Sequence, residues 1–196
     1  PPPPPPPPFS SRRRHTRSLV PSRGLGDVYK RQVRNRSSLA AAVEKALEFG
    51  ETAMIEAYIS GMEITCGVLG NQDLDALPLI EIIPGEGYEF FDYEAKYQPG
   101  ATQEICPARI DAELTQKAQA CAIAAHNALY CQGYSRTDMI LKDDEFFVLE
   151  TNTIPGMTGT SLFPQSAKAA GMSFGQLLDR LIELGMEARR RQTTRG

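Results

Sequence analysis

Apolar side chains recur every three or four positions in four parts of the chain, the spacing that buries one face of a helix. Residues 39–49 have this pattern and follow two serines that can cap a helix. Residues 111–131 carry the longest such run. Shorter runs cover 164–170 and 174–186, the second preceded by another capping serine. The pattern therefore predicts four helices.

Other stretches are short, rich in β-branched and apolar residues, and bounded by turn residues, as strands are. They are residues 52–59, 63–69, 77–83, 136–141 and 145–150. The first two and the last two are each joined by a short turn, so neighbouring strands read as hairpins. This order predicts an α+β fold with a mainly antiparallel sheet and packed helices.

Charge divides the chain into a basic head, an acidic body and a basic tail. Residues 1–36 hold nine Lys or Arg side chains and one acidic residue, whereas residues 37–186 hold eight against twenty-two. Pro and Arg dominate residues 1–32, which cannot bury a core, so we predict that this head is disordered. We expect one domain over 33–186 and a basic tail over 187–196.

The head has a distinctive sequence of its own. Residues 10–32 resemble the translated read-through of a sequencing-library adapter, which makes the head an artefact without a biological role. The alternative is an arginine-rich arm that binds nucleic acid or anionic lipid. We rank that alternative last and expect neither a nucleic-acid partner nor a membrane partner.

Composition argues against two further classes of protein. The basic head leads into no apolar segment of the kind found in signal peptides, and no window reaches the roughly 18 consecutive apolar residues of a membrane helix. The four cysteines contain no CxxC pair, which is typical of reduced thiols rather than of disulfides or a metal site. These features predict a cytoplasmic protein.

The most informative polar residues lie on the last predicted hairpin. If its turn is residues 143–145, Asp138 lies opposite Glu150. Strand alternation then turns Asn152 to the same face. Carboxylate and amide oxygens are ligands that Mg²⁺ and Mn²⁺ prefer, so this face is a candidate metal site, with two ordinary solvated acids as the alternative. Arg136 shares the face and could bind a phosphate or a developing oxyanion.

Two loops add candidate chemistry. Residues 84–98 are rich in glycine and aromatic side chains and contain Lys96 and Tyr97. Such a stretch is too aromatic for a linker and is typical of an ordered surface loop that carries function. Residues 153–159 include Gly156, where the backbone can approach a ligand closely and offer an N–H donor.

Longer motifs surround these residues. Residues 136–164 read RTDMILKDDEFFVLETNTIPGMTGTSLFP, residues 54–65 MIEAYISGMEIT, residues 91–97 FDYEAKY and residues 102–108 TQEICPA. Together they resemble the carboxy-terminal signature of the D-alanine-D-alanine ligases, members of the ATP-grasp superfamily. From about residue 33 to 186, the order and spacing of the blocks agree with that family.

The resemblance implies where ATP would bind. Glu56 would accept a hydrogen bond from the adenine amino group. The backbone of Tyr58 and Ile59 would line the base, and Glu63 would bind the ribose hydroxyls. The implied cofactors are ATP and two Mg²⁺ or Mn²⁺ ions, held by the residues of the oxygen-rich face: Asp138, Glu150 and Asn152.

The resemblance also implies the reacting groups. Lys96 would meet the transferred γ-phosphate. Arg136 and the Gly156 N–H would stabilise the tetrahedral oxyanion. Ser161 and the Leu162 N–H would bind the carboxylate of the second D-alanine.

The implied activity is ATP-dependent ligation of two D-alanines through an acyl phosphate, which yields the dipeptide for peptidoglycan synthesis, cell-wall biogenesis and cell shape. Tyr97 goes with a D-alanine acceptor, whereas phenylalanine there goes with D-lactate-using relatives. The alternatives are a D-alanine-D-lactate ligase, another ATP-grasp carboxylate-amine ligase, and a non-catalytic nucleotide- or metal-binding fragment.

The resemblance covers only the carboxy-terminal part of the family. It begins in the helix after the family's glycine-rich phosphate loop, and the amino-terminal and central domains have no counterpart. We therefore expect an incomplete ATP-grasp carboxy-terminal domain that is inactive by itself. A homodimer is expected of full-length members.

Overall fold

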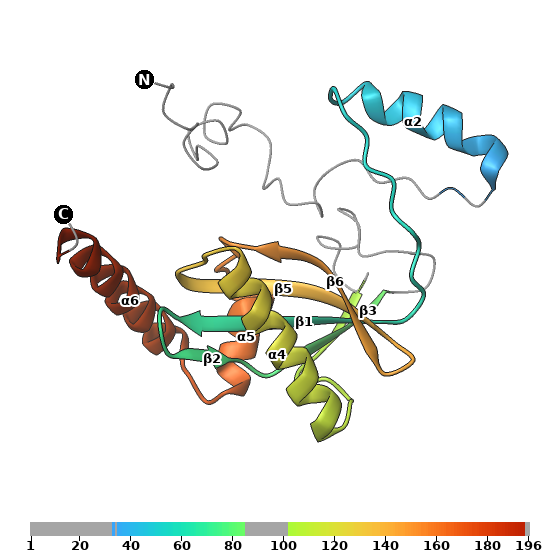
Figure 1. Ribbon diagram of the computed structural model, residues 1–196. Coiled ribbons are helices and arrows are strands. Elements are labelled where there is room, and N and C mark those ends of the chain that lie inside the picture. The colour runs from blue at the N-terminus through green and yellow to red at the C-terminus, as the bar shows by residue number, and fades with distance from the viewer. Residues whose placement is uncertain (1–32, 34, 85–101, 195–196) are drawn as a thin grey trace, which may run out of the picture. The chain divides into compact units, whose positions relative to one another are not determined.

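The computed structural model describes residues 33, 35–84 and 102–194. The backbone contacts divide the chain into two compact units, residues 1–54 and residues 55–196. Figure 1 shows the helices and strands of each unit. The second unit holds the sheet and all of the predicted site residues.

In the first unit a 3-10 turn, η2 (Arg36–Ser38), leads into helix α2 (Leu39–Leu47), close to the predicted helix 39–49. The predicted serine cap is wrong, because Asn35 supplies the capping oxygen. Its Oδ1 accepts a hydrogen bond from the Ser38 backbone N–H at 3.0 Å, as asparagine before a helix commonly does. The Ser38 side chain makes no capping bond to α2.

The strand predicted over residues 52–59 is not formed. These residues are assigned no regular secondary structure, and Ile55 and Tyr58 are 65% and 61% exposed. A strand needs a neighbour to satisfy its backbone N–H and C=O groups, and no described strand pairs with this segment. The segment therefore has β propensity but no strand to pair with in the described part of the chain.

A six-stranded antiparallel sheet forms the centre of the second unit, as far as its residues are described, and it confirms the predicted antiparallel arrangement. The order is β4-β3-β1-β5-β6, with β2 paired to the end of β1. Seven of the nine residues of β1 are buried, because β1 has neighbours on both sides. The strands are β1 (Met62–Gly70), β2 (Leu74–Ala76), β3 (Ile80–Pro84), β4 (Thr102–Ile105), β5 (Gly133–Lys142) and β6 (Glu145–Asn152).

The first part of the predicted strand 77–83 is a connection instead. β2 ends at Ala76 and β3 begins at Ile80. Pro78 lies between them and has no N–H to donate to a ladder, so the chain leaves the sheet there. The preceding residue, Leu77, still donates its backbone N–H to the Gly67 carbonyl at 2.8 Å.

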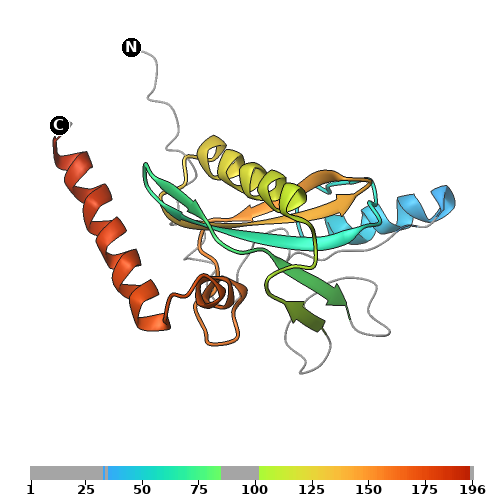
Figure 2. The same cartoon turned by 90° about the horizontal axis from the view of Figure 1, so that it is seen from below.

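Helices cover both faces of the sheet (Figure 2). α4 (Ala112–Ala128) packs on one face, while α5 (Leu162–Ala169) and the first half of α6 (Phe174–Thr194) pack on the other. The cluster beneath α4 consists of Ile64, Cys66, Val68, Leu79, Ala118, Ala122 and Met139. The cluster at α5 and α6 consists of Leu69, Leu77, Phe163, Ala167, Leu177 and Leu184.

The last helix begins as predicted and ends later. Ser173 Oγ accepts from the Gln176 N–H at 3.3 Å, and Gln176 Oε1 accepts from the Ser173 N–H at 2.8 Å. This reciprocal pair is a capping box. The helix then continues through Thr194, so most of the predicted tail 187–196 is helical.

The hairpin of β5 and β6 has a shorter turn than predicted. Only Asp143 and Asp144 form it, both at positive φ, 51° and 62°, as a two-residue type I′ turn requires. Lys142 therefore pairs with Glu145 and not with Phe146. Taken alone, this change would shift every later pair of the hairpin by one residue.

A bulge restores the predicted pairing further along the hairpin. Met139 pairs with Val148, whereas the neighbouring Asp138 pairs with Glu150, so Leu149 is an extra residue on β6. A β-bulge of this kind places two residues opposite one. The shorter turn and the bulge each change the register by one residue, in opposite directions. Asp138 therefore faces Glu150, as the sequence predicts.

An ion pair between the buried Glu81 and the exposed Arg109 fixes the connection from β4 to α4. The Glu81 carboxylate is 3% exposed and accepts from Arg109 Nε at 2.9 Å and Nη2 at 2.7 Å. These hydrogen bonds lower the pKa of Glu81 below its ordinary value of 4.5. A carboxylate with a lower pKa in the folded state stabilises the fold above its unfolded pKa, and this contribution is lost as pH falls through the folded value.

We therefore expect the variant Arg109→Ala to be less stable than the wild type at neutral pH, with a difference that shrinks as the pH falls through the lowered pKa of Glu81 and this carboxylate is protonated. Urea unfolding at several pH values measures both effects. Lys117→Ala is the matched control, because Lys117 forms an exposed ion pair with Glu113 and such pairs contribute little. A deficit for Arg109→Ala that is the same at every pH would contradict the expectation.

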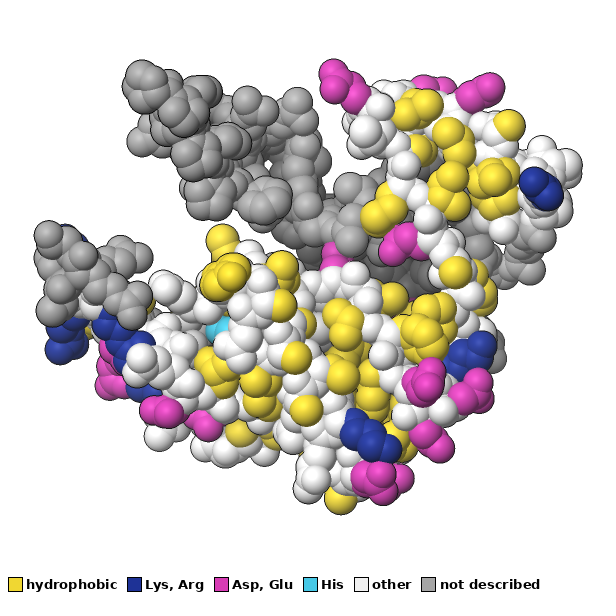
Figure 3. Space-filling model, in the orientation of Figure 1, with side chains coloured by type: hydrophobic (Ala, Val, Ile, Leu, Met, Phe, Trp, Pro, Cys, Tyr) yellow, Lys and Arg dark blue, Asp and Glu magenta, His cyan; other side chains and the backbone are white. Residues whose placement is uncertain are grey.

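No helix in the described ranges is long and apolar enough to cross a membrane. On the face drawn in Figure 3, hydrophobic side chains reach the surface between charged ones. On the edge strand β6, Val148 and Leu149 are 47% and 41% exposed.

Cys66 is buried, which raises the pKa of its thiol to about 12.

Candidate functional site

Three neighbouring strands carry the polar residues of the site. Asp138 on β5 pairs with Thr65 on β1 and with Glu150 on β6. Residues paired across antiparallel strands point to the same face, so these three form one row. Arg136 and Asn152 pair with each other two positions further along and form a second row beside it. The structure thus brings all four predicted residues of the hairpin to one face.

Three hydrogen bonds hold the Asp138 carboxylate. The Thr65 hydroxyl donates to Oδ1 at 2.6 Å. The Arg136 guanidinium donates from Nε to Oδ1 and from Nη2 to Oδ2, both at 2.9 Å. Only 13% of the Arg136 side chain and 22% of the Asp138 side chain are exposed. Bidentate pairs of this kind are strong and directional, so Arg136 and Asp138 fix each other.

Thr65 is the site residue that sequence reasoning missed. It is 1% exposed and lies on a strand whose pattern suggests only a buried core. Its partner Asp138 is 73 residues away in the chain. A single sequence does not show how two strands so far apart in the chain are paired. Only that pairing would have indicated that Thr65 lies beside Asp138.

Asn152 ends β6 and begins the loop that leads to α5. Its side-chain oxygen accepts a hydrogen bond from the Ile154 backbone N–H at 3.1 Å. This Asx turn is a common way for asparagine to start a turn. It holds the amide at the border of the carboxylate face.

Hydrogen bonds within the loop between β6 and α5 converge on Ser161. The Thr158 N–H donates to Ser161 Oγ at 3.0 Å, and the two hydroxyls are 2.8 Å apart. A Cβ on Gly156 would lie 2.9 Å from Ser161 Oγ. Gly156 and Ser161, both predicted to contact substrate, are therefore neighbours, and a side chain at 156 would have to displace the Ser161 hydroxyl.

Helix α5 starts directly after this loop and is anchored at its first turn. Ser161 is the N-cap residue, and Leu162 is 6% exposed, packed against β3. Gln165 Nε2 donates to the Glu104 carboxylate at 2.5 Å and to the Thr160 carbonyl at 3.0 Å. The first backbone N–H groups of a helix lack partners within the helix and favour a negatively charged group.

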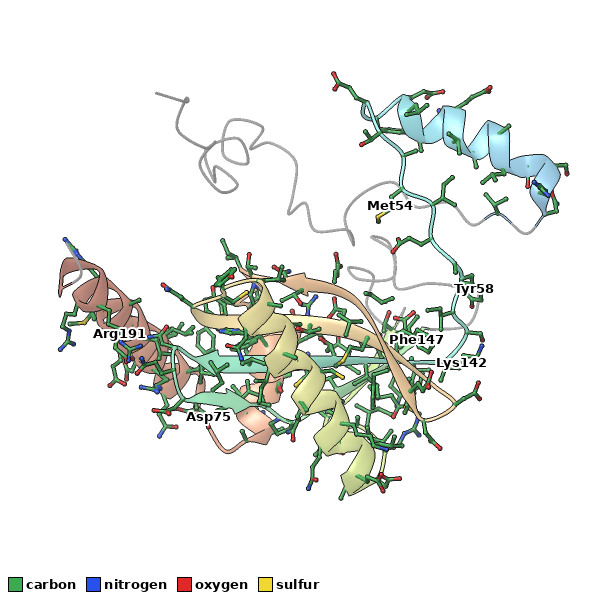
Figure 4. The ribbon with its side chains drawn as sticks, viewed as in Figure 1. Met54, Tyr58, Asp75, Lys142, Phe147 and Arg191 are labelled. Carbon is green, nitrogen blue, oxygen red and sulfur yellow. The ribbon has the colours of Figure 1, made fainter. Side chains whose placement is uncertain are left out.

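The residues predicted to contact adenosine lie where the chain enters the sheet. Glu56 and Tyr58 are exposed and Ile59 is half-buried, on the segment before β1. Figure 4 labels Tyr58 on this segment. Glu63 lies on β1 two residues before Thr65, so its side chain shares the face of the carboxylate row.

All of the aromatic loop 84–98 except Pro84 lies outside the described residues, including Lys96 and Tyr97, as does the head 1–32. The described strands on either side of the loop pair with each other at Pro84 and Thr102. β3, the strand that precedes it, lies two places from β5 in the sheet. The proposed roles of Lys96 and Tyr97 thus remain predictions.

The donor set of the face suits a hard cation. Asp138 and Glu150 offer carboxylate oxygens from paired positions, and Asn152 offers an amide oxygen nearby. Within the described ranges, no group of three or more His, Cys, Asp or Glu side chains could hold a metal ion. Two carboxylates would need amide, water or phosphate oxygens as further ligands, which Mg²⁺ commonly takes.

A buried histidine lies on the other side of the sheet and outside the site. His126 is 1% exposed, and its Nδ1 is 2.8 Å from Ser135 Oγ. Burial lowers the pKa of His126 below its ordinary value. His126 belongs to α4 and packs against Ser135 of β5, so it is a structural residue.

Comparison with known sequences shows one family. The family model described as "D-ala D-ala ligase C-terminus" matches residues 21–183. The D-alanine-D-alanine ligase of Syntrophobacter fumaroxidans is 65% identical over 155 residues, which are 79% of this chain and 50% of that protein. This chain spans about half the length of the curated relatives it matches.

Comparison with solved structures agrees. A D-alanine-D-alanine ligase from Bacillus anthracis complexed with ATP has a TM-score of 0.70 and 36% identity, covering 82% of this chain and 50% of that one. The VanG D-Ala:D-Ser ligase from Enterococcus faecalis has a TM-score of 0.65 and 40% identity, covering 76% and 43%. These matches confirm the predicted carboxy-terminal ATP-grasp fold.

Proposed function

This chain belongs to the family of D-alanine-D-alanine ligase carboxy-terminal regions, and from that membership we propose that it forms the ATP- and metal-binding part of such a ligase. The proposed reaction joins two D-alanines at the expense of ATP. An acyl phosphate forms on the first D-alanine, and the amine of the second displaces the phosphate. Because the chain covers half of its relatives, we propose that it is inactive alone.

The observation that carries this proposal is the shared face of β1, β5 and β6. Asp138 and Glu150 face each other there, with Asn152 beside them. Carboxylates on paired positions repel each other, and for two unit charges 4 Å apart the repulsion would be roughly 4 kcal/mol at an effective dielectric near 20. Arg136 offsets this repulsion in the structure through its ion pair with Asp138. A cation bound to the same oxygens would offset it in the working enzyme.

The residues of this face then have distinct tasks. Two Mg²⁺ or Mn²⁺ ions, when bound, would neutralise the ATP phosphates; Asp138, Glu150 and Asn152 would hold them. Arg136 would stabilise the oxyanion with the Gly156 N–H. Catalysis of phosphoryl transfer rests mostly on such positioning and charge stabilisation, which a rigid sheet face supplies.

The binding of substrates would extend from this face in two directions. Glu56, Tyr58, Ile59 and Glu63 would contact adenosine at the entry to β1. At the other end, Ser161 and the Leu162 N–H would hold the second D-alanine by its carboxylate. The hydrogen bonds around Ser161 and its position as the N-cap residue of α5 support this assignment.

The second substrate differs among the relatives, which include a D-Ala:D-Ser ligase as well as D-alanine-D-alanine ligases. Tyr97 supports a D-alanine acceptor, and Lys96 would meet the γ-phosphate. We also propose the physiological setting of the family: peptidoglycan synthesis in the cytoplasm, by a homodimer of the full-length enzyme.

Titration of the chain with Mg²⁺-ATP tests the proposed site. We expect weak binding by the wild type and a loss of about ten-fold or more in affinity for Glu150→Ala, because a ligand of the ions is removed. Glu145→Ala is the matched control, since Glu145 is an exposed acid on the same strand. Calorimetry or a fluorescent ATP analogue gives the affinities. Equal affinities for wild type and Glu150→Ala would refute the site.

A further inference from the structure

The hydroxyl of Thr65 lies at the β1 end of the row that it forms with Asp138 and Glu150. Thr65 Oγ1 is 2.6 Å from Asp138 Oδ1 and 3.3 Å from the Thr137 carbonyl. A hydroxyl has one proton, and 2.6 Å is typical of an O–H donating to a charged carboxylate. The proton therefore goes to Asp138.

The surroundings leave the Thr65 hydroxyl little freedom. Thr65 is 1% exposed on the central strand. Its β-branched side chain has few allowed χ1 rotamers, and losing the bond would leave a buried polar atom unsatisfied. The hydrogen bond thus fixes the direction of the Asp138 carboxylate from the β1 side.

The two partners of Asp138 respond differently to a cation. Arg136 is positively charged, so a metal ion at the same carboxylate repels it. Thr65 is neutral, and its bond to Oδ1 is compatible with a metal ion at Oδ2. When the ion is bound, Thr65 is the described partner that can keep holding Asp138.

We propose that Thr65 is a positioning residue for the divalent cation: it holds Oδ1 of Asp138 so that Oδ2 is presented to a metal ion shared with Glu150. This inference rests on the proposed function, because it needs a cation at this face. Partners of this kind behind a metal ligand typically contribute ten-fold or more to affinity.

Titration of the whole chain with Mn²⁺ alone, followed by the electron paramagnetic resonance signal of the free ion, tests the proposal. We expect Thr65→Val to weaken Mn²⁺ binding by about ten-fold and Thr65→Ser, which keeps the hydroxyl, to restore it. Thr137→Val is the matched control. Thr137 is also buried but bonds Thr151 on the opposite face of the sheet.

The outcomes separate the two proposals. If wild type binds Mn²⁺ and Thr65→Val binds equally well, the role of Thr65 is refuted while the site stands. If wild type fails to bind Mn²⁺, both are refuted. Circular dichroism checks that each variant folds, and Thr65→Ala replaces Thr65→Val should valine prevent folding, with the same expected loss. A loss in Thr137→Val equal to that in Thr65→Val would also overturn the proposal.

Discussion

Replacing Phe163 with alanine is expected to destabilise the second unit by about 3–5 kcal/mol, the range for deleting a buried phenylalanine side chain. Phe163 is 1% exposed. Its ring packs edge-on against Tyr134, with centroids 5.4 Å apart at 62°. It also packs on Gly67, where a Cβ would lie only 2.9 Å from the ring. The cavity left by alanine lies between sheet and helix and cannot collapse without moving α5.

Removing the Phe163 ring would also disturb the site, because Phe163 follows Leu162 and sets the position of the α5 N-terminus. Urea unfolding followed by circular dichroism measures the change in the free energy of unfolding. Phe174→Ala is the matched control, since Phe174 is 47% exposed on α6 and should cost much less. Similar losses for the two variants would show that the contacts of Phe163 do not hold α5.

The hairpin shows how far one sequence can predict a site. Alternation along β5 and β6 places Asp138 and Glu150 on one face, and the structure agrees. The predicted turn that led to that pairing is wrong, because the real turn is one residue shorter and a bulge then shifts the register back by one residue. Type I′ turns favour Asn-Gly or Asp-Gly, so an Asp-Asp turn gives only a weak signal, and a bulge leaves none.

The central strand shows where prediction from sequence stops. The apolar pattern of β1 identifies a strand but cannot show that Thr65 is bonded to Asp138. The segment 52–59 shows the converse, because its β propensity is evident but strand formation depends on a neighbour. Both depend on contacts distant in the chain. The Ser173 cap of α6 is correctly predicted because its contact is local, whereas the predicted serine cap of α2 is wrong because Asn35 competes with it.

The strongest test of the proposed activity adds the part of a relative that this chain does not match. Relatives of about twice the matched length carry the family name, and the family match of this chain is to the carboxy-terminal part. The amino-terminal half of the Syntrophobacter fumaroxidans relative, fused ahead of residues 33–196, would give a protein with both halves of that relative. At 65% identity over the shared part, most contacts between the halves should be retained.

We expect this fusion to release ADP in a D-alanine-dependent manner and the isolated chain to release none. Glu150→Gln in the fusion should reduce turnover by two to three powers of ten, the loss typical of removing one group that stabilises transition-state charge. Glu145→Gln should not. Coupled measurement of ADP gives the rates. An active isolated chain would contradict the proposed inactivity, and a Glu150→Gln fusion as active as its parent would show that the carboxylate face does not serve catalysis.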